Sequence, residues 1–213
     1  MMKIAFINGS PKSGESASAS LLEDLKTLLS HGEVVSSDFH LGKPAISPEE
    51  MEQLGDHDIL VFAFPLYYDG IPSHLLRCLS QLEKYFSSQK EKDIRVYALV
   101  NNGFYEGHQN ALAIGMMKNW CVRAGLKWGQ GLGCGAGGMI LAVKNVPFRS
   151  RPKKKIGEAL EELSGNIANK ASGESIFVTM DIPRILYKLA GEMGWRQSIK
   201  ANGLKKKDLF LQK

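Results

Sequence analysis

Short apolar runs alternate with amphipathic stretches along most of this chain. The strongest run, at 58–64, is apolar on both faces, as a central strand of a parallel sheet is. Runs of similar length lie at 3–8 and 94–100, and a weaker one lies at 33–39. The pattern predicts a strand at each of these places.

Apolar residues recur at helical spacing between and after the predicted strands. Such stripes lie at 21–29, 75–86, 113–124 and 156–167, and a short acidic helix is expected near 47–54. Strands that alternate with helices predict an α/β fold with a parallel sheet between two layers of helices. Ligands bind such sheets at the carboxyl ends of the strands, so we expect the loops after the strong runs to converge on one site.

Glycine occupies alternate positions from 129 to 135, within WGQGLGCGAGG. Glycine at every second residue weakens a strand and indicates that something approaches the backbone closely. We interpret this as tight packing of a helix on the last strand rather than as contact with a ligand.

The positive charge of the chain lies in its C-terminal part. The formal net charge is +5 and the sequence pI is about 9.0. Residues 1–150 carry 14 basic and 15 acidic side chains, whereas residues 151–213 carry 13 and 7. We expect a compact domain over 1–172 and a basic arm over 173–213 that packs on the domain or on a partner subunit. Nucleic acid and an anionic membrane surface are less favoured partners, because no nucleic-acid motif accompanies the lysines.

No apolar stretch is long enough to cross a bilayer. The longest, at 59–68, has the length of a buried strand with a following loop, and the N-terminal run is too short for a secretory signal. Three cysteines and five histidines are spread without the spacing of an iron–sulfur or zinc site. We expect a cytoplasmic protein without a bound metal.

The first loop, NGSPKSGESAS, follows the first predicted strand directly. From Gly9 it reads G-x-x-x-x-G-E-S, a nucleotide-binding P-loop with Glu15 where that motif needs lysine. Hydroxyl groups of Ser10, Ser16 and Ser18, with a helix N-terminus, suit a single phosphate monoester, whereas a carboxylate would repel ATP or GTP. A serine-rich capped turn without a ligand is the alternative.

The next two loops are rich in aromatic residues. FPLYYDGIP brings Tyr67 and Tyr68 to the end of the central strand, and NNGFYEG brings Phe104 and Tyr105 to the end of the following one. Rigid aromatic residues at strand ends make a wall for a flat ring system, although the tyrosines also suit a contact with a neighbouring subunit. Together the loops predict a pocket with a phosphate at one end and a planar heterocycle at the other.

These motifs resemble the NADPH-dependent FMN reductase-like branch of the flavodoxin-like fold. The resemblance rests on GSPK with SAS before a leucine-rich helix, on PLYYDGIP and on NGFYE, and it covers about residues 3–135. It implies a flavodoxin-like three-layer sandwich with a five-stranded parallel sheet, extended by a C-terminal helical arm. Lys12 departs from the family, which often has arginine there, so a single point charge replaces bidentate pairing.

The resemblance also implies which residues hold FMN. It places the phosphate at Ser10, Lys12, Ser16 and Ser18. It places the isoalloxazine ring beside Pro65, Leu66, Tyr67, Tyr68 and Asp69, and the pyrimidine edge of that ring beside Asn102, Gly103, Phe104, Tyr105 and Glu106.

By the same resemblance the protein is an FMN-dependent NAD(P)H oxidoreductase that passes hydride from NADPH or NADH to a quinone, a nitro or azo compound, or free flavin. No catalytic side chain is expected, since the cofactor supplies the chemistry. A flavodoxin-like electron-transfer protein without substrate turnover is the alternative, but such carriers are typically acidic and this chain is basic. A homodimer is expected, because the apolar stripe of the arm would otherwise stay exposed.

Overall fold

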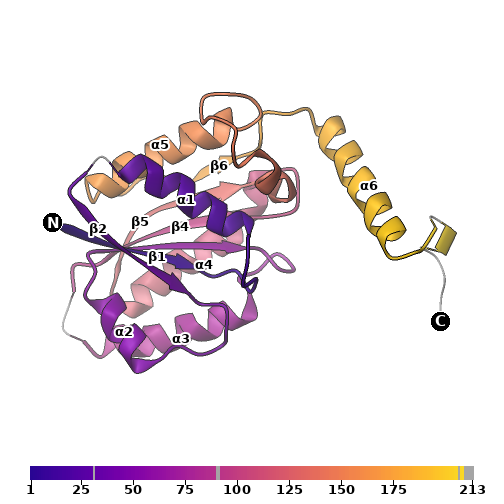
Figure 1. The fold of residues 1–213 in the computed structure, drawn as a ribbon. Helices are drawn as coiled ribbons and strands as arrows, with labels where there is room; N and C mark the ends of the chain where they lie inside the picture. The colour runs from indigo at the N-terminus through magenta and orange to yellow at the C-terminus, as the bar shows by residue number, and fades with distance from the viewer. Residues whose placement is uncertain (31, 90–91, 206, 209–213) are drawn as a thin grey trace. The chain divides into compact units, whose positions relative to one another are not determined.

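The computed structural model describes residues 1–30, 32–89, 92–205 and 207–208. Its centre is a parallel sheet of six strands in the order β2-β1-β3-β4-β5-β6 (Figure 1). The expectation of five strands is wrong by one, because the short β6 extends the sheet beyond β5. The strands are β1 (Met2–Asn8), β2 (Val34–His40), β3 (Ile59–Pro65), β4 (Arg95–Asn101), β5 (Lys127–Cys134) and β6 (Ile176–Val178).

Helices cover both faces of the sheet. Figure 1 shows α1 and α5 on one face and α2, α3 and α4 on the other. The helices of this part are α1 (Ala17–Leu29), α2 (Pro48–Gly55), α3 (Ser73–Ser87), α4 (Ala111–Ala124) and α5 (Lys154–Ala168), with 3-10 turns η1 (Gly107–Asn110), η2 (Gly137–Met139) and η3 (Leu141–Val143).

The strand order sets where a ligand can bind. The chain starts at β1, passes to the edge strand β2 and returns across β1 to β3. The helices that follow β1 and β3 therefore lie on opposite faces, which leaves a crevice at the carboxyl ends of these two strands. The order of the first five strands is that of the flavodoxin-like fold, so the expected fold class is confirmed apart from the strand count.

Apolar residues on both faces of the central strands fill the core. Every residue from 59 to 64 on β3 is fully buried. On one face α3 and α4 pack against each other, and Nε1 of Trp120 donates to the carbonyl oxygen of Leu79 at 2.8 Å. Burial of apolar surface, at roughly 25 cal/mol per Å², is the main stabilising contribution to such a sheet.

Glycines on β5 lie where neighbouring side chains come closest. A Cβ atom at Gly131 would lie 2.5 Å from Ile114 of α4, and one at Gly129 would lie 2.4 Å from the ring of Tyr97. The prediction of a helix packed tightly on this strand is confirmed at Gly131. At Gly129 the space is filled by Tyr97, whose hydroxyl donates to the carbonyl oxygen of Ala171 at 2.7 Å. Burial raises the pKa of Tyr97 to about 12, so this donor keeps its proton.

The chain divides into two compact units, Met1–Met180 and Asp181–Lys213, and β6 belongs to the first. The second unit contains α6 (Arg184–Ala201), and residues 206 and 209–213 of the expected arm lie outside the described part. No residue of α6 is buried. Its large exposed apolar side chains are Ile185, Leu186, Leu189, Met193 and Trp195. Among the described residues, no helix combines the length and the apolar character that a membrane crossing needs.

A buried ion pair joins α1 to the start of α5. Nζ of Lys153 lies 2.8 Å from both carboxylate oxygens of Asp24 and 3.2 Å from the carbonyl oxygen of Lys144. The exposed fractions of the two charged side chains are 4% for Lys153 and 13% for Asp24. Loss of hydration raises the pKa of Asp24, and the hydrogen bond from Lys153 opposes this rise. Each charge therefore depends on the other to remain in the interior.

Replacing Lys153 by methionine is expected to lower the free energy of unfolding by about 3 kcal/mol at neutral pH, because Asp24 stays buried without its partner. The double variant Lys153→Met, Asp24→Leu should recover most of this loss. In the single variant the pKa of Asp24 in the folded state rises further above its value in the unfolded state. The loss of unfolding free energy should therefore shrink as the pH falls and the carboxyl takes up a proton. Urea denaturation at neutral and mildly acidic pH measures these effects. Equal losses of unfolding free energy in the single and double variants would contradict the pairing of Lys153 with Asp24.

Candidate functional site

A cleft of about 250 Å³ lies at the carboxyl ends of the central strands. Its walls come from the loops after β1, β3 and β4, from the first turn of α1 and from the segment after β5. The residues of the expected site that line it are Ser10, Lys12, Ser16, Ser18, Pro65, Leu66, Tyr67, Asn102 and Gly103. The structure thus brings together parts of all three loops that the sequence singled out.

Some expected residues lie outside the lining of the cleft, and other residues line it unexpectedly. Tyr68, Asp69, Phe104, Tyr105 and Glu106 belong to the flanking loops without lining the cleft. Sequence reasoning missed Ala17, Asn101, Gly137, Gly138 and Leu141. Of these, Gly137 and Gly138 end the glycine-rich segment that was interpreted as a place of helix packing.

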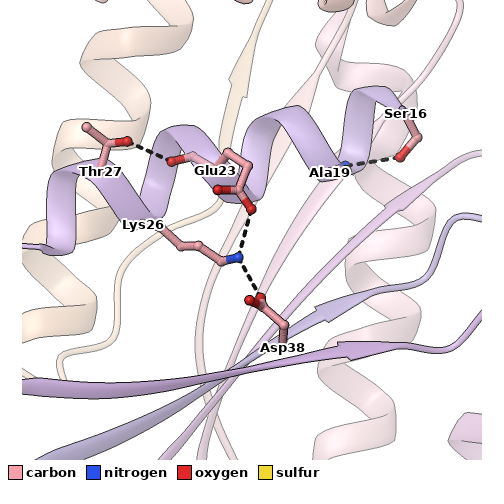
Figure 2. A network of polar contacts seen from close by, with 6 residues as sticks. All are labelled: Ser16, Ala19, Glu23, Lys26, Thr27 and Asp38. Carbon is pink, nitrogen blue, oxygen red and sulfur yellow. Dashed lines mark hydrogen bonds and ion pairs between the residues drawn. The ribbon is translucent and has the colours of Figure 1, made fainter. Parts of the chain in front are cut away.

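The loop after β1 leads into a capped helix N-terminus. Ser16 is the N-cap of α1, and its Oγ accepts a hydrogen bond from the amide of Ala19 at 3.1 Å (Figure 2). The amides of Ala17 and Ser18 have no acceptor within the helix, because the first helical residues have no preceding turn. These N–H groups and the partial positive charge of the helix end favour an anion. Lys12 adds a full positive charge to the same cleft.

Farther along α1, Lys26 links the helix to the edge strand β2. Its Nζ lies 2.7 Å from Oε1 of Glu23 and 2.5 Å from Oδ1 of Asp38 (Figure 2). Burial alone would lower the pKa of Lys26, but the hydrogen bonds to Asp38 and Glu23 outweigh it and raise that pKa. The ion pair between Lys26 and Asp38 therefore links α1 to β2, at the edge of the sheet.

A buried hydrogen bond joins the first turn of α1 to the end of β4. Oγ of Ser18 donates to Oδ1 of Asn101 at 2.8 Å, and both side chains are buried. The hydroxyl proton of Ser18 is thus committed to Asn101, and its backbone amide is the group left for an anion. The same bond fixes the separation between the helix N-terminus and the loop after β4.

Glu15, at the place of the P-loop lysine, pairs with a lysine that lies far along the chain. Nζ of Lys144, which follows η3, lies 2.6 Å from Oε1 of Glu15. Both side chains are well exposed, so the pair contributes about 0–1 kcal/mol to stability. Its effect on the cleft is electrostatic, because Lys144 offsets the negative charge of Glu15 in the loop after β1.

The loop after β3 contains a tight turn with two residues in the left-handed region. The backbones of Tyr67 and Gly70 exchange two hydrogen bonds of 3.1 Å, and the φ angles of Tyr68 and Asp69 between them are 48° and 60°. Such angles are unfavourable for a residue with a large side chain, and strain of this kind concentrates at functional sites. The turn leaves Tyr67 in the cleft wall and Tyr68 fully exposed.

Asn102 lines the cleft and has a side-chain oxygen without a hydrogen-bond partner in the described part of the chain. Its Nδ2 donates to the carbonyl oxygen of Glu106 at 3.2 Å. Its Oδ1 is buried and has no hydrogen-bond partner among the described residues. Buried polar atoms are rarely left unpaired, so this oxygen can accept a hydrogen bond from an ordered water or, after a small movement of the side chain, from a ligand.

The segment after β5 closes the remaining side of the cleft. Ala136 adopts a left-handed conformation, with φ 56°, and its amide donates to the carbonyl oxygen of Phe104 at 2.6 Å. The amide of Gly137 donates to the carbonyl oxygen of Asn102 at 2.7 Å. A Cβ atom at Gly137 would lie 2.5 Å from that same oxygen, so only glycine fits there.

The cleft can bind and orient a ligand but contains few groups that transfer protons. Lys12 and Tyr67 are the only titratable side chains among its lining residues. Cys134, near the end of β5, is fully buried, and burial raises its pKa to about 12, so it is not a ready nucleophile. Within the described residues there is no group of three or more side chains placed to hold a metal ion.

The substitution Gly137→Ala is expected to lower the free energy of unfolding by about 1–3 kcal/mol, because the added carbon meets a backbone oxygen that cannot move aside. Gly165 of α5 provides a matched control, since a Cβ there meets no atom within 4 Å. Gly165→Ala should raise the free energy of unfolding by about 0.5–1 kcal/mol, as alanine is the better helix former. Urea denaturation of both variants tests the difference, and effects of the same sign would contradict it.

No family model and no curated protein matches the chain. Several solved structures are similar to it. An NADH:FMN oxidoreductase in its apo form matches with a TM-score of 0.61 and 16% identity over 86% of this chain and 97% of its own. An NAD(P)H:quinone oxidoreductase from Methanothermobacter marburgensis matches with a TM-score of 0.57 and 16% identity over 78% and 96%. The Trp repressor binding protein from Bacillus subtilis matches with a TM-score of 0.59 and 16% identity over 75% and 96%.

Identities this low show a shared fold alone. The shared fold agrees with the flavodoxin-like strand order of the sheet. It is also consistent with the resemblance to the NADPH-dependent FMN reductase-like family that the sequence motifs carry.

Proposed function

We propose that this protein binds FMN in the cleft and passes hydride from NADPH or NADH through it to a small-molecule acceptor. The proposal depends above all on one observation: a single cleft is lined by the first turn of α1 with Lys12 and by the loops after β3 and β4. Structural neighbours described as an NADH:FMN oxidoreductase, an NAD(P)H:quinone oxidoreductase and an FMN-dependent NADH-azoreductase support it.

The phosphate of FMN fits the α1 end of the cleft. The amides of Ala17 and Ser18, the hydroxyl of Ser16 and the ammonium of Lys12 would hold it. The Oγ of Ser16 already accepts from Ala19, which leaves its proton free to donate to a phosphate oxygen. Two amides, one hydroxyl and one cation suit a monoester better than a triphosphate with its metal ion.

The ring of FMN fits the loops after β3 and β4. Pro65, Leu66 and Tyr67 form an apolar and aromatic wall, which excludes water from one side of a flat ring. Asn102 lines this part of the cleft, and its Oδ1, unpaired among the described residues, would accept from the N–H group of the pyrimidine edge if the side chain turned towards the ring. When bound, FMN supplies a centre that accepts and returns hydride, so the side chains need only orient it and its partners.

The exposure of the aromatic residues favours an enzyme over an electron carrier. Tyr67 is 46% exposed and Tyr68 is fully exposed, so neither side chain closes the cleft. An open cleft admits a nicotinamide and then an acceptor to the same place. A flavodoxin-like carrier without turnover of its own is the alternative. The homodimer that the exposed apolar residues of α6 suggest stays a prediction.

FMN is expected to bind the flavin-free protein more tightly than riboflavin does, because only FMN carries the phosphate. Ser16→Ala should weaken FMN binding by about tenfold and leave riboflavin binding unchanged, since a hydrogen bond to a charged group contributes about 1.5–3 kcal/mol. Ser47→Ala is the matched control, because Ser47 caps α2 in the same way, with its Oγ 3.2 Å from the amide of Glu50, but lies outside the cleft. Flavin fluorescence titrations measure both affinities. Equal affinity of the unaltered protein for FMN and riboflavin would refute the phosphate site.

Anaerobic addition of NADPH or NADH to the FMN-loaded protein is expected to bleach the visible absorbance of the oxidised flavin, because the bound cofactor accepts the hydride. A quinone or nitroaromatic compound added afterwards should restore it. These two steps are the halves of one catalytic cycle, and a visible spectrometer records both. If neither nucleotide reduces the flavin while dithionite produces a stable one-electron-reduced form, the carrier alternative is correct and the enzyme assignment fails.

A further inference from the structure

Two histidines bind successive carbonyl oxygens of the loop after β1. Nε2 of His74 lies 3.1 Å from the carbonyl oxygen of Gly9, and Nε2 of His40 lies 2.8 Å from that of Ser10. A carbonyl oxygen only accepts, so each Nε2 carries the hydrogen and donates it. His74 belongs to the first turn of α3 and His40 ends β2, so two separate elements hold one short segment.

The rest of this segment is also fixed. The amide of Gly9 donates to the carbonyl oxygen of Ala63 on β3 at 2.8 Å, and the amide of Ser10 donates to Oδ1 of Asn8 at 3.0 Å. The next residue, Pro11, has no N–H and a restricted φ angle. No amide of residues 9–11 is therefore left to bind a ligand, and the carbonyl oxygens are the groups whose direction matters.

Both histidines act on the loop from outside the cleft. Neither is among the lining residues, whereas Ser10 lines the cleft and is buried there. A carbonyl oxygen turned towards a bound phosphate would repel it, because both carry negative charge. α3 also abuts the loop directly, since a Cβ atom at Gly9 would lie 2.6 Å from Leu75.

We propose that His40 and His74 are positioning residues for phosphate recognition, which hold the carbonyl groups of Gly9 and Ser10 away from the cleft. The inference rests on the proposed function, because the phosphate in question is that of FMN. The histidines touch neither the phosphate nor the ring. Their contribution is to keep the α1 end of the cleft lined by donors alone, so that it selects a flavin with a phosphate over one without.

The test compares FMN and riboflavin on variants of the whole, flavin-free chain. His40→Leu and His74→Leu, singly and together, remove the donors. His40→Gln with His74→Gln is the rescue, because the amide nitrogen of glutamine reaches about the place of Nε2. His57→Leu is the matched control: its Nδ1 lies 2.7 Å from the carbonyl oxygen of Gln53, so it loses the same kind of bond away from the cleft. Fluorescence titration gives the dissociation constants, and circular dichroism shows that each variant is folded.

The ratio of the riboflavin and FMN dissociation constants is the decisive quantity. We expect the double leucine variant to lower it by about tenfold through weaker FMN binding, the glutamine variant to keep it within about threefold, and His57→Leu to leave it unchanged. An unchanged ratio in the double leucine variant overturns the inference. An equal loss of affinity for both flavins also overturns it, because that result indicates only a packing defect. So does a glutamine variant that fails to restore the ratio. If the double variant does not fold, the single variants decide in the same way.

The failure of the proposed function is a separate result. In that case the unaltered protein binds FMN and riboflavin equally, and the inference falls with it. Where the unaltered protein prefers FMN and the leucine variants share that preference, the proposed function stands and only the role of the histidines is refuted.

Discussion

The buried hydrogen bond between Ser18 and Asn101 is the contact on which the geometry of the cleft depends. It connects the first turn of α1 to the end of β4, and β3 lies between β1 and β4 in the sheet. The first turn of α1, with amides that lack an acceptor within the helix, is therefore held at a fixed distance from the loop after β4. A ligand with an anionic end and a ring end meets both only if this distance is kept.

The segment after β5 is attached to α1 and to the loop before it by two ion pairs of different strength. The exposed pair of Glu15 and Lys144 contributes little to stability and mainly offsets a charge. The buried pair of Asp24 and Lys153 fixes the start of α5, and Lys153 also donates to the carbonyl oxygen of Lys144. Through these contacts α1 positions both the anion site and the opposite wall of the cleft. One helix thus organises two walls that are more than a hundred residues apart in sequence.

The sequence predicted what local periodicity encodes and missed what long-range packing decides. The long strands and their helices follow from runs of apolar residues. β6 begins a stretch that is strand-like in sequence, but three residues do not show by themselves that it pairs with β5 as a sixth strand. The serines at the start of α1 could be placed because a cap lies beside its helix. The part of the cleft wall at Gly137 could not be predicted from the sequence, because it depends on where the chain after β5 meets Asn102. Asp69-Gly70 marks a turn in the sequence, but only the structure shows that Tyr68 itself takes a left-handed conformation and is fully exposed.

The two units of the chain differ in formal charge. Residues 1–180 carry 19 basic and 19 acidic side chains, whereas residues 181–213 carry 8 and 3, so the whole formal excess of +5 lies in the second unit. The unit that contains the cleft has no net charge to attract a phosphate over a distance. Its attraction must come from the helix end, Lys12 and fixed N–H groups, whose influence falls off within about 8–10 Å in physiological salt. The direction of each nearby backbone carbonyl then matters as much as the presence of a cation.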